Sequence, residues 1–299
     1  MTSSDKRAPK TPSEKKRSRE ALASACEGAG IGRFGPLLAS AIRQDRKTYT
    51  AKEGGSGDIL VASYNIHKCV GLDRRFDPHR IATVIKEIDP DVIALQEADQ
   101  RFGERVGLLD LKMLKRECGL VAVPMSIPQP GHGWHGNVVL FRDGSVSNAT
   151  QIVLPGVEPR GALVVDLELS AGPIRIIAAH LGLLRRSRAQ QIETLLASAQ
   201  PEDGRPTVLM GDLNEWRLGE RSALQKLAPS FGPLHAVIPS FPSRFPVLAL
   251  DRILSLPAGA IAGVRLHDSP LARIASDHLP LKAAVSLARG MAAKASAAA

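Results

Sequence analysis

The order of the apolar segments along the chain most limits the folds that its 299 residues can adopt. Near the start, the strand-like run Ile59–Ile66 is followed by a helical repeat over Ile81–Ile88 and by a second short apolar run, Asp91–Leu95. The middle of the chain instead contains strand-like runs in direct succession: Asn137–Arg142, Gln151–Leu154, Ala162–Leu169 and Ile174–His180. A single doubly wound parallel sheet would not contain such a stretch. The pattern therefore predicts an α/β (α+β) fold with two packed sheets and helices outside them.

Further elements follow from the same periodicities. Helices are expected at Leu108–Cys118, Leu184–Ala199 and Arg217–Leu227, and strands at Thr207–Met210, Leu248–Leu254, Ile261–Leu266 and Pro280–Val285. Residues 1–57 hold twelve Lys/Arg and six Asp/Glu, so +6 of the net charge of +9 lies there. We expect 1–57 to be a basic, largely disordered arm and linker, 58–286 to be the folded domain, and 287–299 to be an Ala-rich tail. The arm is first interpreted as a disordered solubility tail; the alternatives are a tether for an anionic partner such as nucleic acid and a partner-binding helix.

The cysteines and the hydropathy indicate a cytoplasmic protein. Cys26, Cys69 and Cys118 form no CxxC pair and are odd in number, which is unlike a disulfide framework or a zinc site. No apolar run approaches the roughly 18 residues that a transmembrane helix requires. We therefore expect no transmembrane segment.

Polar residues stand at the expected ends of otherwise apolar strands. Burying them is costly unless each has a partner or a metal, so a shared site is the simplest explanation. The set comprises Asn65, Glu97, His180, Asp212, Asn214, Asp251, Asp277 and His278. Each of them alone could be a strand cap, a turn or a plain ion pair.

The composition of this set favours phosphate chemistry. Carboxylate and amide oxygens without thiolates are the ligands that Mg²⁺ or Mn²⁺ prefers. Two histidines beside them could hydrogen-bond or protonate phosphoryl oxygens. Asp277 next to His278 could fix the tautomer of that imidazole, although neighbours in sequence need not face each other. Together they suit in-line attack of water on a phosphate ester.

The ordered motifs YNIH, LQE, HGN, RGAL, AAHL, GDLN, LDRIL and SDHLPL resemble the endonuclease/exonuclease/phosphatase superfamily. This group includes deoxyribonucleases, abasic-site endonucleases, inositol polyphosphate 5-phosphatases and sphingomyelinases. The similarity covers about residues 58–286 and is strongest to small stand-alone bacterial members. It implies a four-layer αββα sandwich, two mixed β-sheets face to face with helices on the outer faces, and a site at one edge.

The resemblance also implies roles for individual residues. Glu97 resembles the principal metal ligand with Asn65 beside it, and Asp277 resembles a carboxylate near His278 that is a further candidate ligand of the metal. Asp212 resembles the residue that activates water, assisted by Asn214, while His180 and His278 resemble the pair on the scissile phosphate. Further residues are expected to bind substrate or phosphate: Arg160, His135, Asn137 and Asp251. Arg160 has the bidentate fork that suits phosphate, although it could also be a surface residue before a strand.

Departures from the individual branches leave the substrate open. Glu97 is followed by Ala98-Asp99 and not by Thr-Lys, and the chain has only two tyrosines, which disfavours abasic-site cleavage. Neither an aromatic membrane hairpin nor the signature loops of inositol phosphatases are evident. The sequence therefore predicts a Mg²⁺-dependent phosphodiesterase with nuclease-type substrates slightly ahead of lipid headgroups and soluble phosphomonoesters. The alternative of another class is a catalytically silent scaffold that binds nucleic acid or a membrane.

Overall fold

The computed structural model describes residues 58–100, 103–125, 130–199, 204–232, 234 and 237–288. The expected basic arm, 1–57, and all but the first two residues of the expected Ala-rich tail, 287–299, lie outside the described residues. No helix within the described ranges is long and apolar enough to cross a membrane.

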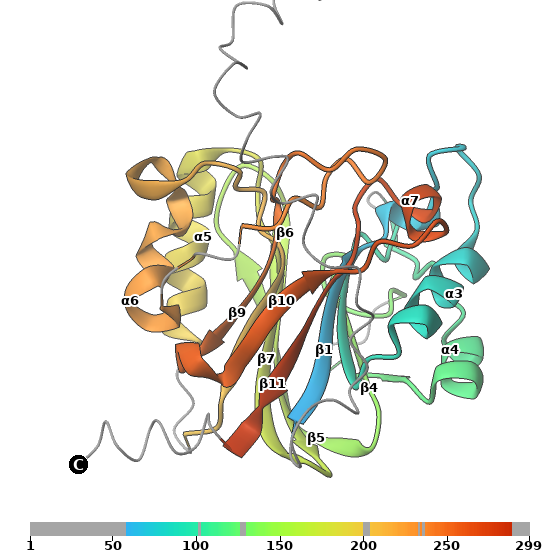
Figure 1. The fold of residues 1–299 in the computed structure, drawn as a ribbon, viewed down its shortest axis with the longest axis horizontal. Coiled ribbons are helices and arrows are strands. Elements are labelled where there is room, and N and C mark those ends of the chain that lie inside the picture. The colour runs from blue at the N-terminus through green and yellow to red at the C-terminus, as the bar shows by residue number, and fades with distance from the viewer. Residues whose placement is uncertain are drawn as a thin grey trace, which may run out of the picture. The chain divides into compact units, whose positions relative to one another are not determined.

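Two mixed sheets form the centre of the molecule (Figure 1). The first has the order β10 (Ile261–Leu266), β11 (Leu281–Ser286), β1 (Asp58–Asn65), β2 (Val92–Gln96), β4 (Val138–Phe141) and β3 (Val121–Ala122). The second has the order β5 (Gly144–Leu154), β6 (Arg160–Leu169), β7 (Gly172–His180), β8 (Thr207–Asp212) and β9 (Asp251–Leu256). Only the β1–β2 and β7–β8 pairs are parallel; the other strand pairs of the two sheets are antiparallel.

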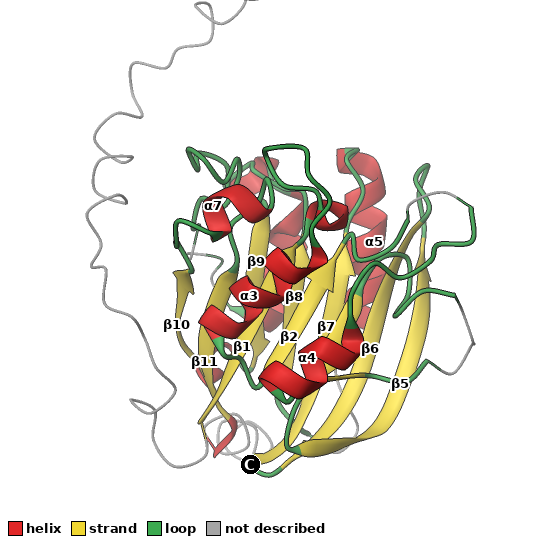
Figure 2. Ribbon diagram, turned by 90° about the vertical axis from the view of Figure 1, so that its right-hand side faces the viewer, coloured by secondary structure: helices red, strands yellow, loops and turns green. Residues whose placement is uncertain are grey.

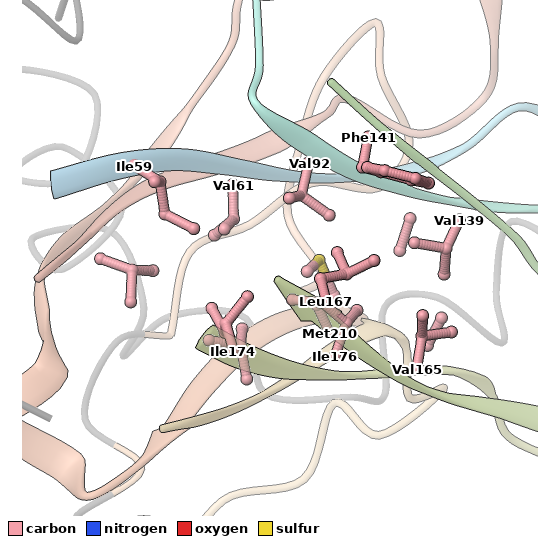
Figure 3. Packing of buried hydrophobic residues seen from close by; sticks show 14 of the residues in the cluster. Ile59, Val61, Val92, Val139, Phe141, Val165, Leu167, Ile174, Ile176 and Met210 are labelled. Carbon is pink, nitrogen blue, oxygen red and sulfur yellow. The ribbon is translucent and has the colours of Figure 1, made fainter. Parts of the chain in front are cut away.

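The sheets face each other across an apolar layer. Alternate side chains of β1, β2 and β4 point toward alternate side chains of β6, β7 and β8, as the period of two in a strand requires. Figure 3 shows this contact with Ile59, Val61, Val92, Val139 and Phe141 on one side and Val165, Leu167, Ile174, Ile176 and Met210 on the other. This layer fixes the two sheets against each other.

Helices cover the outer face of each sheet, as Figure 1 shows. The first sheet packs on α3 (Pro78–Ile88), α4 (Leu111–Cys118) and α7 (Ala272–Ala275). The second packs on α5 (Arg185–Ala197), on the 3-10 helix η5 (Ala223–Leu227) and on α6 (Ala228–Phe231). The expected four-layer αββα sandwich is thus confirmed.

The expected helix over Arg217–Leu227 is wrong. This segment contains two short 3-10 helices, η4 (Gly219–Arg221) and η5, joined at Ser222. Gly219 has φ +60°, which interrupts a right-handed helix, and the Ser222 hydroxyl accepts a hydrogen bond from Leu224 N and starts a new turn. Strand β5 also begins seven residues before the expected Gln151, because its outer half is a polar, solvent-facing strand without an apolar pattern.

The topology explains how the polar strand ends meet. β1, β2, β7 and β8 finish at one edge, and β9 and β11 run antiparallel to β8 and β1. Asp251 therefore begins β9, and the Asp277-His278 pair lies in the bend just before β11. The sequence had suggested that all three residues end strands. The longer loops gather with α7 at this end of the sandwich (Figure 2).

Candidate active site

Asp212 is the centre of a buried cluster at the shared edge. It ends β8, where its register partners are His180 of β7 and Asp251 of β9. Its Oδ2 accepts a hydrogen bond of 3.0 Å from Asn65 Nδ2 at the end of β1, and lies 3.4 Å from His180 Nε2. Asp212, His180 and Asn65 are each no more than 4% exposed. At this edge of the sandwich, the Asp212 carboxylate therefore links the second sheet to Asn65 of the first.

The turn after β8 holds the other oxygen of Asp212. Asn214, with a left-handed φ of 51°, donates its backbone N–H to Asp212 Oδ1 at 3.0 Å and its side-chain amide to Leu181 O at 2.9 Å. The residue before Asp212 must be glycine, because a Cβ on Gly211 would lie 1.8 Å from Ala179 O. The glycine and the asparagine of the GDLN motif, Gly211 and Asn214, therefore both help to fix the position of Asp212.

Asp251 orients the second histidine. His278 Nδ1 donates to Asp251 Oδ2 at 2.8 Å, and Ser240 Oγ donates to the same oxygen at 2.5 Å. With its proton on Nδ1, the ring presents Nε2 to Asp212 Oδ2 at 3.7 Å. The adjacent Asp277 does not fill this position; its Oδ1 lies 3.7 Å from His67 Nδ1. The orienting carboxylate is thus distant in sequence from its histidine.

The environments of the two histidines drive their pKa values apart. Burial is the main cause that lowers the pKa of His180 to about 4, and Arg160 adds to it against the opposing charge of Asp212. Burial alone would also lower the pKa of His278, but Asp251, Asp212 and Asp277 outweigh it and raise that pKa to about 10. At neutral pH, His180 is therefore neutral and His278 is an imidazolium. Such a split separates a hydrogen-bonding group from a proton donor.

A small cavity opens beside this cluster. Its lining consists of Lys68, Glu97, Asp99, Arg105, His135, Pro159, Arg160 and His180. Three ion pairs organise its wall: Lys68 with Glu97, Arg105 with Asp99 at 2.9 Å, and Arg160 with Glu158 at 2.7 Å. Arg160 Nε is buried and has no hydrogen-bond partner among the described residues. A phosphate in this cavity would meet the Arg160 side chain as part of the wall.

Glu97 has the properties of a metal-binding carboxylate. Burial would raise its pKa, but His180, Lys68 and His67 outweigh that effect and lower the pKa to about 2. Glu97 directly follows Gln96, the last residue of β2, and Gln96 pairs with Asn65, the last residue of β1. Glu97 and Asn65 are therefore close neighbours at the ends of two adjacent strands. In the described part of the chain no group of three His, Cys, Asp or Glu side chains is arranged to hold an ion. The donors fit a magnesium ion that keeps waters and shares substrate oxygens, not an all-protein metal cage.

The remaining predicted residues have different positions. His135 lines the cavity, and its Nδ1 lies 3.2 Å from Pro159 O. Asn137 is fully buried outside the cavity lining; its amide donates to Trp134 O and Gly161 O and so holds the turn before β4 against β6.

Sequence reasoning gave no site role to Lys68, Asp99, Arg105 or Ser240. The replacement of Thr-Lys by Ala98-Asp99 after Glu97 counted only against abasic-site cleavage, although Asp99 lines the cavity. Ser240 lies in a loop that carries no motif.

Comparisons with known proteins identify the family and the fold. A model of the Endonuclease/Exonuclease/phosphatase family matches residues 62–278. The uncharacterized protein YbhP of Escherichia coli (strain K12) is 30% identical over 255 residues, which cover 76% of this chain and 96% of YbhP. The crystal structure of an endonuclease/exonuclease/phosphatase from Beutenbergia cavernae is similar with a TM-score of 0.59 and 23% identity, over 77% of this chain and 72% of that one. D. rerio TDP2 in complex with a single-strand DNA product is similar with a TM-score of 0.54 and 16% identity, over 76% of this chain and 98% of that one.

Proposed function

The chain belongs to the endonuclease/exonuclease/phosphatase family, a family of phosphate-ester hydrolases, and from this premise we propose that it is a Mg²⁺-dependent phosphodiesterase. One observation carries the proposal. Asp212, held by Asn65 and Asn214, lies between a neutral His180 and a protonated His278, beside a cavity that Arg160 lines. These are a base, an acid and a phosphate-binding group within one site.

The residues divide the work of an in-line displacement. Asp212 accepts a proton from the attacking water, which Asn65 and Asn214 favour because their hydrogen bonds fix the orientation of the carboxylate. His278 donates the Nε2 proton as the leaving oxygen departs, and Asp251 stabilises the ring in the required orientation. His180 and Arg160 hydrogen-bond the phosphoryl oxygens. One proton is taken from water and one is given to the leaving group, so the protein's net charge is unchanged.

The metal site of the proposal comprises Glu97 and Asn65, with Asp277 as a further candidate. Enzymes of this family generally use divalent metal ions. A bound Mg²⁺, or Mn²⁺ in its place, would act as a Lewis acid on a phosphoryl oxygen. Glu97 suits this role because its low pKa keeps it ionised over the whole range in which the protein would work.

Nucleic acid is the first substrate class of the proposal, because the cavity combines three cations, Lys68, Arg105 and Arg160, that can follow a phosphate backbone. Lipid headgroup phosphodiesters are a second candidate. The observation that favours them is a set of exposed apolar side chains on the loops that immediately follow His180 and Asp212. Both classes present the same diester to the site.

Hydrolysis of bis-(p-nitrophenyl) phosphate and p-nitrophenyl phosphate with Mg²⁺, Mn²⁺ or EDTA tests the proposal. We expect metal-dependent cleavage of the diester and a kcat lower by roughly 10²–10⁴-fold in Asp212→Asn. Asp268→Asn is the control, since Asp268 is a surface carboxylate paired with Arg273. Preference for the monoester would contradict a phosphodiesterase and indicate a phosphatase.

A silent scaffold makes the opposite prediction. It would bind nucleic acid or lipid but show no turnover, and Glu97→Ala or His278→Ala would change nothing measurable on these substrates. Metal-dependent turnover that either substitution abolishes would exclude the scaffold.

A further inference from the structure

Five large apolar side chains are exposed on three loops at the edge that carries the site. We call this set the apolar rim: Val157 at 82% exposure, Leu183 at 63%, Leu184 at 53%, Trp216 at 50% and Leu218 at 60%. The loops connect β5 to β6, β7 to α5, and β8 to η4. Gathered apolar side chains of this size on a protein surface commonly mark an interaction site.

Hydrogen bonds hold the three loops together. Glu158, next to Val157, accepts a hydrogen bond of 2.6 Å from Leu183 N. Arg188, which is 1% exposed, donates to Leu183 O at 2.6 Å and to Glu215 Oε2 at 3.2 Å, so it ties the second loop to the third. Arg185 Nε donates to Arg221 O at 3.0 Å. The backbone is therefore fixed with the apolar side chains facing outward.

Arginines surround the apolar rim. Arg185, Arg186 and Arg221 are exposed, and among the described residues none of them forms an ion pair with a carboxylate. The guanidinium of Arg217 lies over the Trp216 ring, 4.4 Å from its centroid. Arg185, Arg217 and Arg221 also line a surface hollow together with Glu220. The rim thus combines apolar area with unneutralised positive charge.

The rim lies next to the site, because its loops follow site residues directly in the sequence and because Glu158 contacts both. Leu183 lies three residues after His180, and Trp216 lies four residues after Asp212. Glu158 pairs with Arg160 in the cavity wall and accepts the bond from Leu183 N in the rim. A surface that covers the rim would therefore lie directly beside the mouth of the cavity.

We propose that the apolar rim docks the protein on the surface of an anionic lipid bilayer. Leucine, valine and tryptophan insert at the boundary of headgroups and acyl chains, and flanking arginines pair with anionic headgroups. A nucleic acid would use the arginines, but it offers no partner to Val157, Leu183, Leu184 and Leu218, since sequence-tolerant binding relies on aromatic stacking. The docking is a property of the rim and does not depend on the proposed hydrolysis.

Sedimentation with lipid vesicles tests the docking. We expect the full chain to bind vesicles of equal parts phosphatidylcholine and phosphatidylglycerol, and to bind phosphatidylcholine alone much more weakly. The emission of Trp216, one of two tryptophans, should shift to the blue on binding, and Trp216→Phe should remove that shift because only Trp134 remains. Wild-type protein that fails to bind the mixed vesicles would overturn the proposal, and arginine-dependent binding to DNA in its place would assign the rim to nucleic acid.

Matched variants separate the rim from other charges of the chain. Leu183→Ser combined with Trp216→Ser should weaken vesicle binding about tenfold or more, and Arg186→Ser about fivefold. Arg116→Ser, an exposed arginine on α4, should have no effect. Because every variant keeps residues 1–57, a loss is due to the rim, and undiminished binding in the double variant would overturn the assignment. Cleavage of soluble bis-(p-nitrophenyl) phosphate by the double variant should equal that of wild type, so failure of docking and failure of catalysis are distinguishable.

Discussion

The site has two halves that are built in different ways. The strand-end half consists of Asn65, His180, Asp212, Asp251 and His278, each at most 5% exposed. The first four stand on the ends or starts of paired strands, and His278 lies three residues before β11. The cavity half consists of Lys68, Glu97, Asp99, Arg105, His135 and Arg160. Four of its members have left-handed φ angles between 49° and 56°: Lys68, Glu97, Arg105 and His135.

The difference indicates a division of labour. Strand pairing fixes backbone positions through many hydrogen bonds, so the strand-end half can hold proton-transfer groups at set distances. The cavity half depends on turns in a backbone region that residues other than glycine and asparagine seldom adopt. We infer that the first half performs chemistry and the second selects and holds the ligand.

The largest expected effect comes from His278 in the strand-end half. His278→Gln should lower kcat by roughly 10²–10⁴-fold, because the proton donor to the leaving group is removed. The measurement is kcat for bis-(p-nitrophenyl) phosphate with Mg²⁺. A rise in KM with kcat unchanged would contradict the division, since it would make His278 a binding group.

The pH dependence sharpens the same prediction. The pKa of His278 is raised to about 10 from its usual value near 6.5, so its protonated form persists through neutral pH and is lost as pH rises through about 10. Activity should fall as pH rises through about 10, whereas the contribution of this group to stability should decline from about pH 6.5 and be lost by about pH 10. Asp251→Asn should move the fall to lower pH, because the carboxylate that raises the pKa is gone. An alkaline limb that stays in place would contradict a positioning role for Asp251.

Substitutions of two glycines compare a strand end with a loop in their effect on the stability of the fold. Gly211→Ala should destabilise the fold by about 3 kcal/mol or more, since the new Cβ would lie 1.8 Å from Ala179 O at a φ of +150°. Gly219→Ala, in η4, has φ +60° and no atom within 4 Å of the new Cβ, so only about 1 kcal/mol is expected. Urea unfolding measures both. Equal losses would show that the strand ends are no more constrained than the loops.

The same contrast explains what the sequence could predict. Asn65, His180 and Asp212 were found because each interrupts an apolar strand pattern, and the order of strands was enough to predict the sandwich. Lys68 and Arg105 were given no site role because a polar residue in a polar loop carries no periodic signal. The pairing of Asp251 with His278 joins residues 27 apart and depends on strand direction, which periodicity alone does not specify. The helix expected over Arg217–Leu227 failed for a related reason, since one glycine conformation decided it.

Arg105 tests the cavity half with a smaller effect. Arg105→Gln should raise KM about tenfold with kcat nearly unchanged, because a charge-assisted hydrogen bond to a phosphate oxygen is lost. Steady-state kinetics on bis-(p-nitrophenyl) phosphate check it, with exposed Arg116→Gln on α4 as the control. If kcat fell as far as in His278→Gln, Arg105 would belong to the chemistry and the two halves would not differ in function.

The smallest expected effect concerns the metal. Glu97 and Asn65 provide few protein ligands, so binding of Mg²⁺ should be weak. At an ion concentration about five times Kd, it should stabilise the fold by roughly 1 kcal/mol, which corresponds to about 2 to 4 °C in Tm. Thermal unfolding with and without Mg²⁺ measures the shift.

Two substitutions decide whether Glu97 or Asp212 supplies the carboxylate that binds the ion. Glu97→Gln should abolish the Mg²⁺-dependent rise in Tm, because the ionised carboxylate of the cavity half is replaced by a neutral amide. Asp212→Asn should keep the rise while it loses turnover, since Asp212 is already bonded to Asn65 and Asn214 within the strand-end half. Loss of the rise in Asp212→Asn alone would place the ion among the strand ends. Metal binding and proton transfer would then share one carboxylate, and the two halves would have to be treated as a single unit.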